Sequence, residues 1–300
     1  MVVLKAKYFY KLDLREINSS DLNDISFKPK RTPSKRNFKF LRQHKYIKKN
    51  NYLKTKVKYY KKAIGKNLEG KLVSFHHSKG YRRLYREIEN IRYKRIHSGI
   101  IEQIEYNPNH SCLLARIYNP ELNYHFYIRA VEDLIIGNYI KTSESSRFPG
   151  DTGNLLTLDI GKPINNIHLK NSNNIARSAG TFGAILQKYT NYCLLRFPSQ
   201  KLYYVPSNSQ ATLGRLTNSK YHLTNLGKAG RKRWLGKRPH VRGVAMNPID
   251  HPHGGGEGKT SGGHSTSISP WGKPTKQIKK KVMLNCSKNR KKVTLKVEIQ

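Results

Sequence analysis

Residues 100–130 read IIEQIEYNPNHSCLLARIYNPELNYHFYIRA, and this stretch decides the fold class. The turns Asn107-Pro108-Asn109 and Asn119-Pro120 divide it into three short runs rich in apolar and aromatic residues. In the second and third runs the side chains alternate with a period of two, which is typical of β-strands. Several short strands separated by turn residues indicate a small barrel or sandwich.

A second β unit is predicted to follow Pro149-Gly150-Asp151. Short alternating runs occur at residues 167–169 and 182–186. Residues 193–197 and 202–205 flank a turn of four residues, as the two strands of a hairpin do. We expect this second unit to end near Gly214, and the chain to be mainly β.

The charge of the chain predicts a polyanionic partner. The chain has 300 residues, with 58 Lys and Arg against 18 Asp and Glu, and a formal net charge of +40. Such an excess destabilises a compact monomer by self-repulsion and favours association with a polyanion. No amphipathic basic helix and no run near the roughly 20 apolar residues of a membrane span occurs, so we expect no membrane partner. The 19 tyrosines suit stacking on nucleic-acid bases, although a basic protein that binds no RNA remains the alternative.

Residues 1–69 are predicted to be a basic N-terminal extension. Between residues 25 and 68 there are 16 Lys or Arg and no carboxylate, and Pro29 and Pro33 disfavour a regular fold. We interpret this part as a basic arm whose interspersed tyrosines contact RNA, with a solvated disordered tail as the alternative.

Residues 226–300 are predicted to be an extended basic segment. Glycines and prolines after Asn225 exclude long helices or strands there. From residue 160 to residue 300 the chain has 26 Lys or Arg and only three acids, so the segment needs anionic surroundings. Its candidate phosphate-binding cations are Lys228, Arg231, Lys232, Arg233, Lys237, Arg238, Arg242, Lys259, Lys273 and Lys276. Trp234 and Trp271 either stack on bases or hold the loop in place.

Acidic and histidine side chains at residues 250–264 raise the alternative of a metal-dependent enzyme. Asp250, His251, His253 and Glu257 are chemically suitable zinc ligands, with His264 nearby. However, Pro252 and three following glycines leave no rigid element to hold ligand geometry, and the surrounding positive charge repels a cation. We therefore expect these histidines to donate hydrogen bonds to RNA.

The three cysteines predict neither a local zinc site nor a disulfide framework. Cys112, Cys193 and Cys286 are far apart in the sequence and have no CxxC spacing. Cys112 and Cys193 lie in apolar runs, so we expect them to be reduced core residues.

The stretch AMNPIDHPHGGGEG at residues 245–258 resembles the signature of the universal L-two family of large-subunit ribosomal proteins. Four further segments resemble the family in the same order, and the similarity covers roughly residues 70–281. They are ARSAGT at 176–181, ATLG at 211–214, LGKAG at 226–230 and PWGKPT at 270–275.

The resemblance implies an OB-like barrel at residues 70–150 and an SH3-like barrel at 151–225. The extended segment would then reach into ribosomal RNA near the peptidyl transferase centre. The implied role is structural and not enzymatic: assembly of the large subunit, subunit association and tRNA positioning. The implied partners are large-subunit rRNA and neighbouring ribosomal proteins, with tRNA and the small subunit close by, and the chain would enter as one copy rather than as a homo-oligomer. No intrinsic cofactor is expected, although magnesium could be shared with the rRNA.

The resemblance also suggests roles for single residues. Arg177 falls in a turn of the second barrel, and Asn247, His251 and His253 fall in the signature, so all four are candidate RNA contacts. His251 matches a family histidine once proposed to assist peptide-bond formation. Because the ribosome's catalyst is RNA, we assign His251 a structural or positioning role.

Two segments depart from the family pattern. Residues 76–80 read HHSKG where the family often has a glycine-rich run, and His110 stands where an arginine is common. A histidine there weakens a cationic contact at neutral pH. Residues 1–69 and the tail after about Lys281 have no clear counterpart.

The abundance of Lys, Asn, Ile and Tyr suggests an A+T-rich gene, as organellar genomes often are. The first 16 residues lack a secretory signal and make a poor presequence. A protein that is made inside an organelle needs no presequence. We therefore expect a mitochondrial ribosome, with a plastid or bacterial origin as the alternative. A separate alternative is an RNA- or DNA-binding regulator outside the ribosome, built on the same β units.

Overall fold

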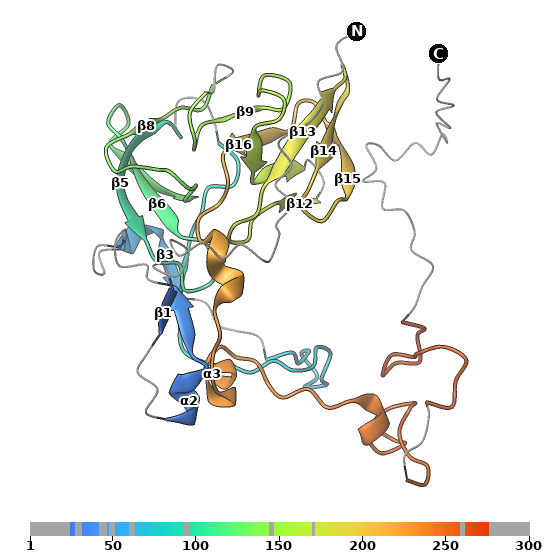
Figure 1. Ribbon diagram of the computed structural model, residues 1–300. Coiled ribbons are helices and arrows are strands. Elements are labelled where there is room, and N and C mark those ends of the chain that lie inside the picture. The colour runs from blue at the N-terminus through green and yellow to red at the C-terminus, as the bar shows by residue number, and fades with distance from the viewer. Residues whose placement is uncertain are drawn as a thin grey trace, which may run out of the picture.

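The computed structural model describes residues 25–27, 32–41, 47, 52–59, 64–92, 97–143, 147–169, 172–258 and 262–275. Figure 1 shows two β-sheet regions side by side, with a long irregular segment that leaves them after the helix α3. The fold is mainly β and agrees with an OB-like barrel followed by an SH3-like barrel, so the predicted fold class is confirmed. None of the described helices is long and apolar enough to cross a lipid bilayer.

The first sheet contains four antiparallel strands in the order β7-β6-β5-β8. They are β5 (Gly99–Glu105), β6 (Leu114–Asn119), β7 (Tyr124–Arg129) and β8 (Tyr139–Ile140). Six consecutive residue pairs join β6 and β7, in agreement with the alternation in their sequences. In β5 the register shifts between Ile101 and Gln103, which lets both Ile101 and Ile104 enter the core.

Residues 52–59, which the sequence interpretation placed in the basic arm, pack on this first sheet. The short helix η1 (Lys54–Lys56) leads into β3 (Val57–Tyr59), which pairs with β4 (Leu84–Arg86). The amide of Leu53 donates a 2.8 Å hydrogen bond to the buried hydroxyl of Tyr127, which itself donates to Glu105 Oε2 at 2.9 Å. Burial raises the pKa of Tyr127 to about 12, so this hydroxyl remains protonated and continues to donate.

The second sheet contains six strands in the order β15-β14-β13-β10-β16-β9. They are β9 (Thr152–Asn154), β10 (Pro163–Asn165), β13 (Gly183–Lys188), β14 (Tyr192–Arg196), β15 (Leu202–Pro206) and β16 (Gln210–Leu213). A separate hairpin joins β11 (Ile167–Leu169) and β12 (Ser172–Ile175). The predicted hairpin at residues 193–205 is confirmed as β14 and β15, with Gln200 in its turn at φ 63°. Cys112 and Cys193 are buried free cysteines, as expected.

Hydrogen bonds connect the two sheet regions and set their relative orientation. The Leu113 amide donates to Thr217 Oγ1 at 3.0 Å, and the Thr217 amide donates to the Ala130 carbonyl at 3.1 Å. The buried guanidinium of Arg129 on β7 donates to Asn90 Oδ1 at 2.7 Å and to Asn166 Oδ1 at 2.9 Å. The chain that follows β16 is therefore fixed against the first sheet region at Thr217.

The described part of the N-terminal arm is more regular than we expected. Strands β1 (Ile25–Phe27) and β2 (Lys39–Leu41) pair antiparallel, and the helix α2 (Pro33–Arg36) lies between them in sequence. The prediction of an irregular arm is wrong here because these residues contact a distant part of the chain, Asn225 to Arg231. Sequence periodicity over such short elements carries no information about that contact.

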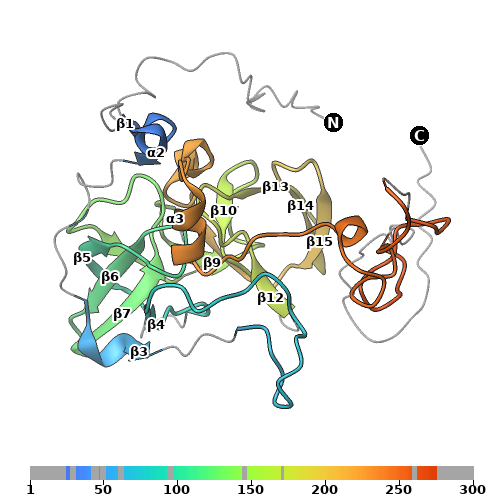
Figure 2. The same ribbon diagram turned by 90° about the horizontal axis from the view of Figure 1, so that it is seen from below.

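The prediction that no long element follows Asn225 is confirmed for the described residues. Only α3 (Ala229–Trp234) and η3 (Gly243–Ala245) occur there, after the short helix η2 (Ser219–Leu223). Figure 2 shows the chain after α3, in orange and red, running past the edge of the second sheet region and away from both.

Candidate nucleic-acid interface

The first part of the extended segment, residues 226–238, is called the root below. Residues 76–81 hydrogen-bond to it. The Tyr81 amide donates to the Trp234 carbonyl at 2.9 Å, and the Ser78 amide donates to the Gly236 carbonyl at 2.9 Å. Gly80 has φ +59°, and a Cβ added there would lie 2.5 Å from the Trp234 carbonyl oxygen. This close backbone approach therefore requires glycine at residue 80. Residues 76–80, which depart from the family pattern, run alongside the root and hold its backbone in place; this contact is called the splint below.

Trp234 is both held and accessible. Lys228 Nζ lies 4.8 Å from its ring centroid, and the Tyr81 ring lies 5.8 Å away at 47°. The side chain is still 43% exposed. The two alternatives for this tryptophan, a loop pin and a stacking surface, are therefore compatible.

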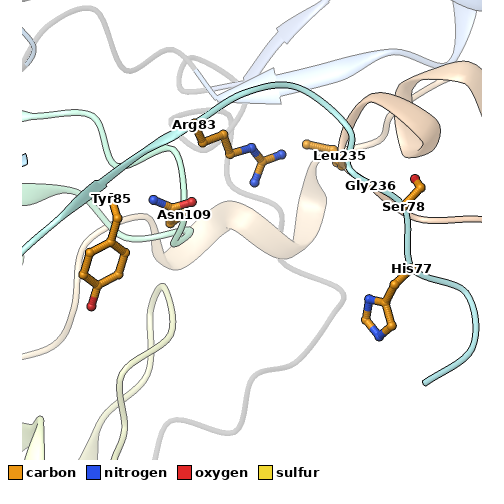
Figure 3. Close-up of a pocket in the computed structure, with 7 residues that line it drawn as sticks. All are labelled: His77, Ser78, Arg83, Tyr85, Asn109, Leu235 and Gly236. Carbon is orange, nitrogen blue, oxygen red and sulfur yellow. The ribbon is translucent and has the colours of Figure 1, made fainter. Parts of the chain in front are cut away.

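A pocket of about 540 Å³ separates this root from the first sheet region. Figure 3 shows the guanidinium of Arg83 pointing toward Leu235, with Asn109 beside it and Ser78 across the pocket. Arg83 Nη1 donates to the Pro108 carbonyl at 2.9 Å, which fixes the group at the rim. No acidic residue lines the pocket, so it suits an anionic group or an RNA base edge.

The described candidate cations of the root and tail have no carboxylate partner among the described residues. Within the described ranges, none of the Lys and Arg side chains between residues 228 and 273 forms an ion pair with a carboxylate. Those that are exposed are Lys228, Lys232, Arg233, Lys237, Arg238, Arg242 and Lys273. Arg231 is half-buried instead, and its guanidinium lies 3.6 Å from the centroid of the Phe38 ring. Lys259 and Lys276 lie outside the described residues.

The signature residues form a tight loop around a buried imidazole. His251 is only 8% exposed, and a Cβ added to Gly243 would lie 2.6 Å from its Nδ1 and Cε1 atoms. The His253 amide donates to His251 Nδ1 at 3.0 Å, so a neutral His251 carries its proton on Nε2. The exposed residue Asn247 supports the loop through its carbonyl, which accepts from the amides of Asp250 and His251 at 3.0 and 3.2 Å.

The metal-site alternative finds no support in this loop. Among the residues that the structure describes, no three His, Cys, Asp or Glu side chains are grouped to hold a metal ion. His251 Nδ1 accepts from a backbone amide, and His253 Nε2 accepts from the Ile268 amide at 3.1 Å. The loop uses these nitrogen lone pairs for its own backbone, while Asp250 and Glu257 are exposed.

Trp271 lies at the tip of a tight turn. Backbone hydrogen bonds from Thr275 to Ser267 and from Ser269 to Lys273, both 2.8 Å, close this turn. The Trp271 ring lies 5.5 Å from the Phe75 ring and remains 60% exposed. The same N-terminal segment that splints the root therefore also touches the tail.

Arg177 lies at a turn between the two sheet regions. Its neighbour Ala176 has φ 56°, and the Arg177 carbonyl accepts from Cys112 Sγ at 3.7 Å. Burial lowers the pKa of His110, and the charges of Arg129 and Arg177 lower it further. His110 is therefore neutral at physiological pH, in agreement with the expectation that it is a weak cationic contact.

The structure brings the predicted residues into three groups: the root, the signature loop with the nearby turn, and the Arg177 turn. Sequence reasoning missed the contribution of residues 75–83 to the first group. The run Lys79-Gly80-Tyr81-Arg82-Arg83 carries a signal of its own, because it interleaves cations with an aromatic residue.

Comparisons with known proteins agree with this arrangement. Residues 53–142 match the family described as "Ribosomal Proteins L2, RNA binding N-terminal domain", and residues 149–272 match "Ribosomal Proteins L2, C-terminal domain". The chain is 43% identical over 227 residues to the protein named "Large ribosomal subunit protein uL2" from Rickettsia peacockii (strain Rustic) and to that from Rickettsia prowazekii (strain Madrid E). Each alignment covers 75% of this chain and 82% of the relative. The protein of the same name from Rickettsia bellii (strain OSU 85-389) is 44% identical over 220 residues, which are 72% of this chain and 79% of the relative. The chain therefore belongs to the ribosomal protein L2 family.

Proposed function

We propose that this chain binds large-subunit ribosomal RNA through the root and tail at residues 226–275, splinted by residues 75–83. As a member of the L2 family, it is a structural constituent of the large ribosomal subunit. The observation that carries the proposed interface is a set of exposed cations that form no ion pair with any described carboxylate, on an irregular segment that leaves both sheets.

Electrostatics supports RNA as the ligand of this surface. An extended segment with this charge cannot neutralise itself, whereas RNA phosphates supply the missing anions and release their counterions on binding. With about ten phosphate contacts, the logarithm of the binding constant should fall with the logarithm of salt concentration at a slope of about −7 to −9. A slope near zero or −1 would contradict an interface of this kind.

The finer role that we propose is to support the RNA near the peptidyl transferase centre, subunit association and tRNA positioning. The buried His251 supports a positioning role, because its ring shapes the backbone of the signature loop and leaves Nε2–H to donate. His253 and Asn247 lie in the same loop. Any magnesium at this surface would be held jointly with rRNA phosphates rather than by a protein site.

We further propose that the ribosome in question is mitochondrial. The similarity to Rickettsia proteins is consistent with an organelle origin, and so is the composition of the chain. A plastid or bacterial ribosome is the competing assignment.

Sedimentation tests this function directly. The tagged chain would be followed through a magnesium-containing sucrose gradient of a lysate from its source organelle, with and without ribonuclease. We expect co-migration with the large subunit that is lost on digestion. Migration as a small species that ignores ribonuclease would overturn the proposal and favour a regulator outside the ribosome.

A further inference from the structure

Residues 32–41 of the N-terminal arm dock on the root of the extended segment. The Lys39 amide donates to the Asn225 carbonyl and the Asn225 amide donates to the Lys39 carbonyl, both at 3.0 Å. Gly227 has φ +71°, and a Cβ added there would lie 2.6 Å from the Ser34 carbonyl oxygen. Two backbones approach this closely only at a specific contact, so the docked position is defined.

Arg231 contributes a side-chain contact to this docking. Its guanidinium lies 3.6 Å from the centroid of the Phe38 ring, and Phe38 stacks on Phe40 with the centroids 5.4 Å apart. Arg231 Nη1 also donates a hydrogen bond to the Leu226 carbonyl. A planar guanidinium can stack on a ring and donate in its own plane at the same time, which a lysine ammonium cannot do.

The docked unit carries exposed cations on both of its parts. Lys35 and Arg36 form the last turn of α2, and Lys232 and Arg233 form that of α3. All four are exposed, and none makes an ion pair with a described residue. Figures 1 and 2 both show α2 close to the segment that contains α3. The residues of α2 lie outside both ranges that match the L2 family, 53–142 and 149–272.

We propose that Arg231 is a positioning residue that holds residues 32–41 against α3, so that Lys35 and Arg36 bind phosphates of the same RNA segment as Lys232 and Arg233. This inference rests on the proposed function, because it assumes that the root binds RNA. In this arrangement Arg231 contacts protein rather than phosphate, and Lys35 and Arg36 add a phosphate-binding site on α2.

A charge-conserving substitution separates positioning from direct phosphate contact. Arg231→Lys keeps the positive charge but removes the stacked guanidinium. We expect the salt slope for binding of the full chain to a transcript of its own large-subunit rRNA to become shallower by about 1.4–1.8, which corresponds to two lost phosphate contacts. Amide hydrogen exchange at Lys39 and Asn225 should speed up at the same time. Arg147→Lys makes the same change at an exposed arginine outside the proposed interface, so it is the matched control and should change neither quantity.

A double-mutant cycle completes the test. The variant with Lys35→Ala and Arg36→Ala should show the same change in slope as Arg231→Lys, with the amide of Lys39 still protected. Adding Arg231→Lys to it should then change the slope no further, because the contacts that Arg231 positions are already absent. An unchanged slope for Arg231→Lys, or additive changes in slope, would overturn the inference.

One further readout and one further variant make the result interpretable. Exchange protection of the β6 and β7 amides reports whether each variant is folded, and Phe38→Leu removes the same stacking from the other side. Phe38→Leu should reproduce the effect of Arg231→Lys, and a normal slope with it counts against the inference. A wild-type chain without a steep salt slope would refute the proposed function itself, whereas a steep wild-type slope with unchanged variants refutes only the role of Arg231.

Discussion

Replacing Thr217 by valine tests whether the contact between the two sheet regions stabilises the fold. Thr217 Oγ1 accepts a 3.0 Å hydrogen bond from the amide of Leu113, which is 4% exposed. Valine keeps the volume of the side chain but offers no acceptor. The amide of Leu113 is then left buried without a partner.

The expected cost follows from that unsatisfied donor. A buried backbone amide that loses its acceptor costs about 1–3 kcal/mol of folding free energy. With a urea dependence of about 2 kcal/mol/M, a loss of about 2 kcal/mol lowers the midpoint of unfolding by about 1 M. Thr217→Ser keeps the acceptor and loses one half-buried methyl group, so it should cost less than about 1 kcal/mol.

Two measurements on the full chain decide the matter: urea unfolding followed by far-ultraviolet circular dichroism, and hydrogen exchange at the amide of Leu113. We expect that amide to exchange about tenfold faster in the valine variant if local opening becomes about 1.4 kcal/mol easier. If the valine and serine variants unfold at the same urea concentration and exchange alike, the hydrogen bond contributes nothing and the reasoning is refuted.

Three further predictions concern the site and the core. Gly243→Ala should displace the His251 ring, because the new Cβ would lie 2.6 Å from two of its ring atoms. Sucrose gradients should then show defective large subunits. The affinity of the free chain for RNA should change less than about twofold, because no phosphate-binding cation is removed. Tyr127→Phe removes the acceptor of the Leu53 amide and should cost about 1–3 kcal/mol, with faster exchange at Leu53 as the specific sign. Burial lowers the pKa of His97, so its stabilising contribution is present above the pKa of the unfolded state, about 6.5, and is lost as the pH falls through the lower folded-state pKa. Thermal unfolding of His97→Gln should accordingly depend less on pH between about 7 and 5 than that of the wild type, and equal pH dependence would contradict this assignment.

Strands β6, β7 and β13 could be predicted because their sequences alternate with the period of a strand, and β14 and β15 because their runs flank a turn. The short strands β8, β9, β10 and β16 were not predicted. Residues 113–118 and 126–130 each place one alternating set of side chains in the core cluster of the first sheet. Burial itself does not alternate, because Leu114, Tyr127 and Arg129 on the opposite faces are also buried. The irregularity of β5 was not predicted. Its register shift inserts one extra residue, and a two-residue period read along the sequence cannot locate such a bulge.

The candidate site was only partly predictable. The cations and the signature residues of the tail are visible as residue types, because charge and glycine content are local properties of the sequence. Their grouping was not visible. Residues 75–83 lie about 150 positions before the root that they splint, and only the folded chain places His76 against His240, with ring centroids 4.3 Å apart.

Arg231 illustrates the same limit on a single side chain. By residue type and neighbours it belongs with Lys232 and Arg233 as a phosphate-binding cation. In the folded chain its guanidinium instead faces Phe38, almost 200 positions earlier. A stacking contact between such distant residues leaves no trace in the local pattern of either one.

The sequence by itself determined the β class of the fold, the presence of a basic irregular tail and, through the residues 245–258, the family. These follow from local periodicity, composition and a long specific motif, each of which can be read without knowing which residues meet. Tertiary structure alone decided how the two sheets dock, that part of the N-terminal arm is folded on the root, and that the His251 ring is enclosed by Gly243. The physical reason is that these features depend on contacts between distant segments, whose free energy arises only when both surfaces are formed and brought together.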